Sequence, residues 1–464
     1  MVERITLNYA NCMEEKIAEH GLKKEDLDSL KLRVMSAHRG LLTRKKEGKL
    51  GFMELPYKSK NAREIKKFAE KLKSKYENFV VIGIGGSALG NIALQTALNH
   101  PFYNLLPSKA RHKYPRIFIL DNIDPALIGD FLDTINPSRT LFNVITKSGT
   151  TIETVSNFMV ILGHLIKKVG KKKHRKHIIA TTGYLAGGIR ELVEREGYHS
   201  FIIPANIGGR FSVLSPVGLV SAAFGGIDVE KLLEGAKFMA EICKEEKLYQ
   251  NPAYMYAIIQ YLMYKKGKRI NVMMPYAHKL KDMADWFRQL WAESLGKKKN
   301  LKEEVVNIGP TPIKALGATD QHSQIQLYIE GPFDKLITFL SVEDFSRTVD
   351  IPEVDDHYLG GQSLNRLLKI EEEATRLSLT KEKRANCTII LPEINEHTIG
   401  QLIYLLELAC ACLGELFDID AFNQPGVELG KILSYALMGR PGYEDKKAKL
   451  EEILARDKKS PYVV

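Results

Sequence analysis

The sequence predicts an α/β protein made of two αβα sandwich lobes with mainly parallel sheets, with further helices at its N- and C-terminal ends. The first observation is that short apolar, β-rich runs alternate with amphipathic helical stretches, which is typical of βαβ units. The second is that this alternation occurs twice, over about residues 50–225 and again over about 226–415. The third is the length of 464 residues, which suffices for two large lobes.

The chain divides into four predicted parts. Residues 1–50 are an N-terminal helical segment, and the first 75 residues are expected to be helical because apolar residues recur at spacings of three and four. Residues 51–225 form a first lobe that carries an anion site, and residues 226–415 form a second lobe. Residues 416–464 form a C-terminal loop followed by one or two helices.

The first lobe begins with a buried strand at Phe79–Ile84, which is apolar and β-branched. A glycine-rich turn follows this strand, and a helix is expected from Ser87, as its N-cap, to Leu98. The other strands of this lobe are expected at RIFIL, FNVIT, HIIATT and SFIIP, with an amphipathic helix between each strand and the next.

The second lobe repeats this alternation after a pair of helices. Its strands are expected at RINVMMP, VVNIG, KLITFL and CTIIL, and the stretch TDQHSQIQLYI is expected to be helical. HTIGQLIYLLELACACL is expected to form a long helix that contains two buried thiols.

The formal net charge of +11 leaves nucleic-acid binding open as one alternative. The basic runs are short, however, and no aromatic residues are interleaved with them to stack on bases. We therefore favour a lysine-rich surface and expect no nucleic-acid partner.

Other features of the composition bear on where the protein works. We find no run of about 20 apolar residues and no apolar leader at the N-terminus, so no membrane span or secretion signal is expected. The five cysteines contain no CxxC pair and are interpreted as buried thiols in a reducing cytoplasm. No His, Cys or carboxylate cluster has the spacing of metal ligands, so we expect no metal or cofactor.

Two loops at the carboxyl ends of predicted strands indicate an anion site. The glycine turn partly matches the dinucleotide fingerprint at Gly83, Gly85 and Ala88. That fingerprint also needs an acid about 20 residues after the glycines, at the end of the next strand. Here the next strand ends at Asp121, 38 residues after Gly83, so the acid is out of place. The loop Thr146–Thr151 places four hydroxyls and one lysine before a helix. Such donors at a helix N-terminus suit a compact phosphate monoester better than a dinucleotide.

Six segments, in order, resemble the glucose-6-phosphate isomerase (phosphoglucose isomerase) family, over roughly residues 50–440. They are GIGGSALG from Gly83, TKSGTTIET from Thr146, GGRFSVLSPVGL from Gly208, the helix end Gln289–Glu293 before Gly296-Lys297, DQHSQ from Asp320 and QPGVELGK from Gln424. The resemblance implies two sugar-isomerase-type lobes. It also implies a cytoplasmic, metal-free homodimer that interconverts glucose 6-phosphate and fructose 6-phosphate in glycolysis and gluconeogenesis.

The resemblance also implies roles for individual residues. Glu293 would carry a proton between C1 and C2, Arg210 would stabilise the enediolate, His322 would open the sugar ring from the partner subunit, and Lys431 would lie near the ring oxygen. Phosphate binding would fall to Ser87, Thr146, Lys147, Ser148 and Thr151, and further substrate contacts to Gly86, Gln289, Gln424 and Glu153. Thr146 stands where the family usually has Ser, and Pro425 stands where many members have Trp.

The residue types suit this chemistry independently of the resemblance. Moving a carbonyl between adjacent carbons needs one base that takes a proton and returns it, and Glu293 shares a helix face with Gln289. Each residue could instead have a purely structural role: Glu293 as a solvated carboxylate on a helix surface, and Arg210 as a member of a structural ion pair. A non-catalytic phosphosugar-binding regulator, or a related aminosugar-phosphate isomerase, would explain the phosphate loops but would give no role to Arg210, Glu293 and Lys431.

Overall fold

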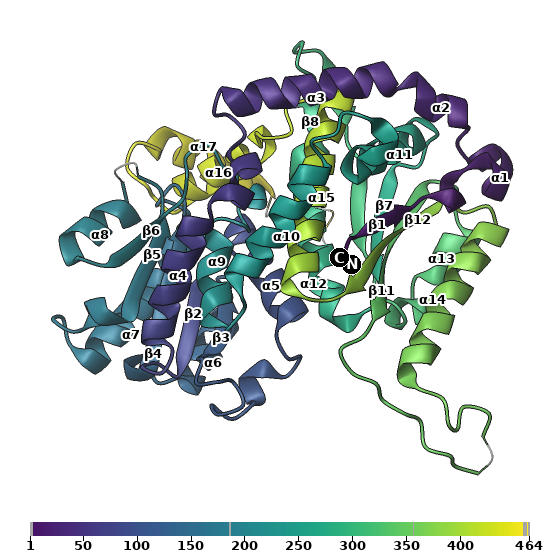
Figure 1. Ribbon diagram of the computed structural model, residues 1–464. Helices are drawn as coiled ribbons and strands as arrows, with labels where there is room; N and C mark the ends of the chain where they lie inside the picture. The colour runs from purple at the N-terminus through teal and green to yellow at the C-terminus, as the bar shows by residue number, and fades with distance from the viewer. Residues whose placement is uncertain (1–2, 185–186, 356, 458–461, 463–464) are drawn as a thin grey trace. The chain divides into compact units, whose positions relative to one another are not determined.

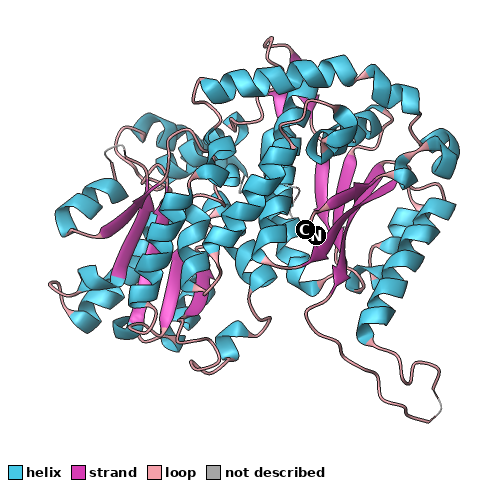
Figure 2. Cartoon of the chain, viewed as in Figure 1, coloured by secondary structure: helices cyan, strands magenta, loops and turns pink. Residues whose placement is uncertain are grey.

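The computed structural model describes residues 3–184, 187–355, 357–457 and 462 (Figure 1). The chain forms two compact units, Met1–Ala421 and Phe422–Val464. Within the described residues, the first unit contains two five-stranded sheets and a two-stranded hairpin, with helices around them (Figure 2). The predicted α/β class with mainly parallel sheets is confirmed, whereas the four-part division of the chain stays a prediction.

The first sheet has the strand order β3-β2-β4-β5-β6, and every neighbouring pair in it is parallel. Its strands are β2 (Asn78–Ile82), β3 (Arg116–Leu120), β4 (Thr140–Thr146), β5 (Ile178–Thr182) and β6 (His199–Ile202). The helices of this part are α4 (Ser59–Leu72), α5 (Leu89–Leu98), α6 (Pro125–Thr134), α7 (Ile152–Val169), α8 (Ile189–Glu196) and α9 (Pro216–Phe224). Because β2 and β4 are parallel neighbours, the loops that follow them leave the same edge of the sheet.

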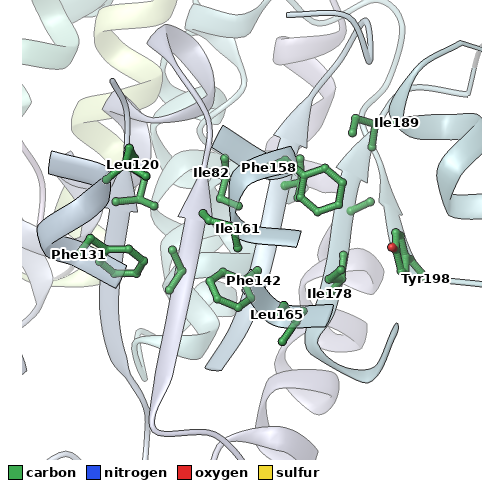
Figure 3. Packing of buried hydrophobic residues seen from close by; sticks show 14 of the residues in the cluster. Ile82, Leu120, Phe131, Phe142, Phe158, Ile161, Leu165, Ile178, Ile189 and Tyr198 are labelled. Carbon is green, nitrogen blue, oxygen red and sulfur yellow. The ribbon is translucent and has the colours of Figure 1, made fainter. Parts of the chain in front are cut away.

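The core of this part follows from the alternation of side chains along the strands. Figure 3 shows Ile82 and Phe142 on the sheet packing against Phe158 and Ile161 of α7, and all four are buried. On the opposite face, Phe79 stacks on Phe224 of α9 with a ring-centroid distance of 4.3 Å. Both faces of the sheet are therefore covered, as the continuous apolar runs predict.

The second sheet has the order β1-β12-β11-β7-β10, and only β1 is antiparallel to its neighbour. Its strands are β1 (Thr6–Asn8), β7 (Ile270–Pro275), β10 (Thr311–Lys314), β11 (Lys335–Asp344) and β12 (Asn386–Glu393). The other helices of the first unit are α1 (Glu14–Ile17), α2 (Lys24–Ser29), α3 (Lys31–Lys46), α10 (Val229–Ile242), α11 (Pro252–Lys265), α12 (Lys281–Leu295), α13 (Ile325–Glu330), α14 (Leu364–Lys381) and α15 (Glu396–Leu416). The second unit contains α16 (Glu428–Leu437) and α17 (Glu444–Asp457), which pack against each other.

Three expectations about this region are corrected. The N-terminal residues are not all helical, since β1 forms an edge strand of three residues, which is too short to show a period. VVNIG does form a strand, β9 (Val305–Ile308), but it pairs with β8 (Lys297–Lys299) outside the main sheet, and β10 takes the edge position instead. TDQHSQIQLYI is α-helical only from Ile325, because a separate 3-10 turn occupies Thr319–His322.

Helix α15 is the central helix of the first unit and packs against α3, α10, α11 and α12. It is the one helix among the described residues that is long and apolar enough to cross a membrane, with a mean hydropathy of 1.5. The expectation that the chain has no apolar run of about 20 residues is therefore wrong for Glu396–Leu416. Because 94% of its most apolar window is buried inside the protein, α15 has the burial typical of a core helix.

Candidate active site

The glycine turn after β2 differs from its predicted form. Residues Gly85–Ser87 make a 3-10 turn, and α5 begins at Leu89 with Ala88 at its N-cap. The prediction that Ser87 is the N-cap is therefore wrong. The turn contains Gly85, whose φ of 56° lies in the left-handed region, and the N-cap of the helix falls one residue later than expected. Within the described residues, the Ser87 hydroxyl makes no capping bond, so it is available to bind a ligand.

The glycine turn lies directly against a second turn, Gly209–Phe211. A Cβ on Gly86 would come within 2.3 Å of the carbonyl carbon of Gly209, so only glycine allows this approach. The Ser212 hydroxyl donates to the Gly209 carbonyl at 2.6 Å and fixes the second turn. Arg210 is thereby brought beside the predicted anion site.

Arg210 is buried, with 2% of its surface exposed, and all three of its guanidinium nitrogens donate hydrogen bonds. Nε donates to Ser294 Oγ at 2.7 Å, and Nη2 donates to the Ala421 carbonyl at 2.6 Å. Nη1 donates to Glu293 Oε2 at 3.2 Å and forms an ion pair with it. Burial lowers the pKa of Arg210, and the Glu293 carboxylate counteracts this effect. The guanidinium is therefore a fixed, oriented cation.

Glu293 lies near the end of α12, a helix that packs against α5, β7 and α15 and so connects the two sheets. Gln289, one helical turn earlier, donates from Nε2 to Glu293 Oε1 at 3.3 Å. The Glu293 side chain is 32% exposed while that of Arg210 is 1% exposed, so the carboxylate is the accessible end of the pair. The predicted shared face of Gln289 and Glu293 is present.

Gln289 also connects this pair to the glycine turn. A Cβ on Gly85 would lie 3.1 Å from Gln289 Nε2. The Oε1 atom of Gln289 is buried and has no hydrogen-bond partner among the described residues. A buried carbonyl oxygen without a donor is unfavourable, and a ligand hydroxyl at this point would satisfy it.

The predicted phosphate loop follows β4, at the sheet edge where the glycine turn follows β2. Thr146 Oγ1 accepts from the Gly149 backbone N–H at 3.2 Å and lies 3.2 Å from Thr151 Oγ1. Ser148 is exposed, and its Oγ accepts from the Thr150 hydroxyl at 3.2 Å. The loop is thus preformed as a cluster of hydroxyls at the start of α7.

Lys147 does not point its charge into this hydroxyl cluster. Its ammonium donates to the carbonyls of Ala205 and Ile207, at 2.7 and 2.9 Å. The ammonium is partly desolvated there, which lowers the pKa of Lys147. In this arrangement Lys147 joins the phosphate loop to the segment that leads to Arg210.

The other four predicted site residues lie in three different places. Glu153 is in the first turn of α7, and His322 is exposed at the end of its 3-10 turn. No hydrogen bond or ion pair recorded within the described residues joins either of them to the Arg210–Glu293 pair. Gln424 and Lys431 belong to the second unit, where the exposed Lys431 pairs with Glu428 at 2.8 Å. The roles of all four stay predictions.

A buried lysine, Lys297, also lies beside this pair, although the sequence pattern predicts no role for it. Lys297 is 8% exposed, and its ammonium donates to the Glu293 backbone carbonyl at 2.6 Å. Burial, reinforced by the nearby charge of Arg210, lowers the pKa of Lys297 to about 8. The sequence could have indicated Lys297 and Ser294 as neighbours of the site only through their short distance from Glu293 in the chain, four residues and one residue.

The buried charge of Lys297 predicts a specific pH dependence of stability. Between a folded pKa of about 8 and an unfolded value of about 10.4, the unfolded chain binds more protons, so stability rises with pH there. We expect the free energy of unfolding of the wild type, relative to Lys297→Met, to rise by about 2 kcal/mol from pH 7 to pH 9.5. Urea unfolding at both pH values measures this difference, and a flat or falling difference would contradict it.

The two mainly parallel sheets, with a glycine turn and a hydroxyl loop at one sheet edge, place the chain in the class of sugar-isomerase-type α/β proteins. The family described as Phosphoglucose isomerase matches residues 55–350 and 367–452. The chain belongs to this family.

Individual relatives agree with this assignment. The chain is 46% identical over 466 residues to a glucose-6-phosphate isomerase of Carboxydothermus hydrogenoformans, covering 99% of both chains. It is 42% identical to that of Rubrobacter xylanophilus, covering 95% of this chain and 99% of the relative. A solved hypothetical protein from Thermus thermophilus superposes with a TM-score of 0.84 at 36% identity, over 94% of this chain and all of the other. A glucose-6-phosphate isomerase structure from Chlamydia trachomatis, with a TM-score of 0.82 at 22% identity over 98% of this chain and 92% of the other, shows the same fold.

Proposed function

We propose that this protein is an aldose–ketose isomerase that interconverts glucose 6-phosphate and fructose 6-phosphate, a step of glycolysis and gluconeogenesis. The observation that carries the proposal is the Arg210–Glu293 pair beside the glycine turn, in a chain of the phosphoglucose isomerase family. A phosphosugar-binding regulator needs no carboxylate held against a buried guanidinium, so it leaves this pair unexplained.

The proposed reaction moves one proton between neighbouring carbons of the open-chain sugar. The Glu293 carboxylate takes the proton from C2 of the aldose, and the electrons of that bond form the C1–C2 double bond of an enediolate with its charge on O1. Arg210 stabilises this charge because its guanidinium is fixed by Ser294 and Ala421 before substrate arrives. Glu293 then returns the proton to C1, and the hydrogen on O2 moves to O1, which leaves the ketose.

Substrate position would be set at the opposite end of the sugar. The hydroxyls of Ser87, Thr146, Ser148 and Thr151, with the start of α7, suit a phosphate dianion. Gly86 and Gln289 would line the sugar between the phosphate and the reacting carbons, and the unpaired Gln289 Oε1 would accept from a sugar hydroxyl. Lys147 would act by holding the loop in place, or would turn from its carbonyls to the phosphate.

We further infer a homodimer in which His322 acts on the partner's site. The motivation is that His322 is exposed and has no recorded contact with Arg210 or Glu293 within the described residues. If each site needs Glu293 from one subunit and His322 from the other, mixing inactive Glu293→Gln and His322→Gln proteins should restore one site per mixed dimer. We expect up to about a quarter of wild-type activity after denaturation and refolding together. No recovery, with mixed dimers present by mass spectrometry, would contradict the shared site.

We infer that the enzyme works in the cytoplasm. All five cysteines fall within the described residues, are buried and form no disulfide, which fits a reducing compartment. The proposed proton transfer uses only side chains of the protein itself, and the sugar phosphate is the one small-molecule partner that it requires.

A coupled assay tests the function. Purified protein is given fructose 6-phosphate, and glucose 6-phosphate is followed through its dehydrogenase as NADPH absorbance. We expect rapid turnover in both directions. Binding without turnover would instead indicate a regulator. Ammonia release or isomerisation with glucosamine 6-phosphate, but none with fructose 6-phosphate, would indicate an aminosugar enzyme.

A further inference from the structure

A cavity of about 540 Å³ lies at the amino ends of β2, β3 and β4. It is formed by the segment that leads into β2, the loop before β3 and the turn before β4. Its lining residues are Ser74, Lys75, Tyr76, Glu77, Ser108, Arg111, Lys113, Tyr114, Arg116 and Arg139. The glycine turn and the phosphate loop of the candidate active site follow the carboxyl ends of β2 and β4, so they lie at the opposite end of this sheet from the cavity.

The walls of the cavity are tied together by backbone hydrogen bonds. The Glu77 N–H donates to the Arg139 carbonyl, and the Arg116 N–H donates to the Glu77 carbonyl, both at 2.7 Å. In the loop before β3, His112 and Lys113 have φ values of 52° and 66°, which residues with side chains seldom adopt. The cavity is therefore a built part of the fold rather than a gap between mobile loops.

The charges that line the cavity are strongly unbalanced. Five lining residues are Lys or Arg, and Glu77 is the one carboxylate among them. That carboxylate pairs with Arg139 at 2.9 Å. Lys75, Lys113 and Arg116 form no ion pair with any described residue. The side chain of Arg116 only donates from Nε to Asn78 Oδ1, at 2.8 Å. Most of the positive charge is thus uncompensated.

Part of this positive charge, that of Arg111, is buried rather than exposed to solvent. It is 8% exposed, and its Nε donates to the Tyr114 carbonyl at 3.1 Å while Nη1 donates to the Leu106 carbonyl. Burial lowers the pKa of Arg111, and the nearby charge of Arg116 acts in the same direction, while Tyr103 and Glu77 counteract this effect. Holding a buried guanidinium near a second one is unfavourable unless an anion also occupies the space.

We propose that this cavity binds a small molecule that carries two or more phosphate groups, at a site separate from the candidate active site. Five cations and the Glu77 carboxylate give the lining a net charge of +4. A single phosphate monoester carries about two negative charges and would leave about half of this charge uncompensated, whereas a diphosphate or bisphosphate can meet more of it at once. The cavity volume falls within the usual range for small-ligand sites, about 300–1,000 Å³, which favours a metabolite over a nucleic-acid backbone. Binding at this cavity does not depend on the isomerase activity.

Isothermal titration calorimetry with three probes tests the site and distinguishes its ligand sources: inorganic pyrophosphate, ADP and fructose 1,6-bisphosphate. Sorbitol 6-phosphate, which has no carbonyl to isomerise, is kept in excess to occupy the candidate active site. The variant is Lys75→Gln/Lys113→Gln, because both lysines are exposed and have no ion pair to lose. The control is Lys171→Gln/Lys172→Gln, which removes the same charge from an exposed turn outside the cavity.

We expect at least one probe to bind the wild type and the control alike in 50 mM NaCl, with affinity roughly tenfold weaker in the cavity variant. Affinity should also fall as salt rises to 200 mM, because the contacts are ionic. No binding of any probe to the wild type at millimolar concentration would overturn the proposal. Equal weakening in the variant and the control, or tighter binding of duplex DNA than of every probe, would overturn it as well.

Discussion

Replacing Glu293 by Gln is expected to lower kcat for fructose 6-phosphate by about 10²–10⁴-fold, because the amide cannot accept the proton that the carboxylate transfers. The substitution keeps the shape of the side chain, so Gln289 and the Arg210 contacts to Ser294 and Ala421 should persist. We therefore expect the Kd for a non-reacting sugar phosphate to change by less than about threefold, since loss of a transition-state interaction need not weaken ground-state binding.

The coupled assay and calorimetry with sorbitol 6-phosphate measure the two quantities separately. Glu303→Gln is the matched control, because Glu303 is 77% exposed and pairs with Lys299 outside the main sheets. This control should keep wild-type kcat. A Glu293→Gln enzyme with near wild-type kcat would exclude Glu293 as the proton carrier, whatever its binding.

The regular part of the fold could be predicted because it depends on local periodicity. Runs such as Phe79–Ile82 in β2 and FNVIT in β4 are buried on both faces, so their apolar pattern is continuous and unambiguous. The strands β1 and β10 have three and four residues and lie at the two edges of the second sheet. Their pairing comes from tertiary contacts rather than from a repeating pattern, so no local signal identified them.

In the candidate site too, features that depend on local spacing could be predicted, and features that depend on distant parts of the chain could not. The shared helix face of Gln289 and Glu293 follows from a spacing of four and could be predicted. The partners of Arg210 could not, because Ser294 and Ala421 lie 84 and 211 residues away in the chain. The N-cap error at Ser87 also has a physical origin, since the left-handed Gly85 adds a turn that no side-chain pattern records.

Arg210→Lys is expected to lower kcat/KM by about 10²–10³-fold although the positive charge is kept. The guanidinium presents three nitrogens in one rigid plane to Ser294, Glu293 and Ala421. A lysine ammonium is a single point at the end of a flexible chain, so it can meet one or two of these acceptors but cannot hold all three while facing a substrate oxygen. The loss should appear mainly in kcat, since the charge would no longer be fixed where the enediolate forms.

Because Arg210 is buried, the same change should also cost about 2–4 kcal/mol of stability through lost hydrogen bonds to a charged group. Far-ultraviolet circular dichroism and urea unfolding therefore accompany the kinetics, and rates are compared where the variant is fully folded. Ser294→Ala removes the acceptor of Nε but leaves the guanidinium and its other two hydrogen bonds in place, so it should loosen the guanidinium and lower kcat by less than Arg210→Lys does. Arg288→Lys, on the exposed face of the same helix, should leave kcat unchanged. If folded Arg210→Lys protein kept wild-type kcat/KM, charge alone would suffice, and the fixed geometry of the guanidinium would have no catalytic role.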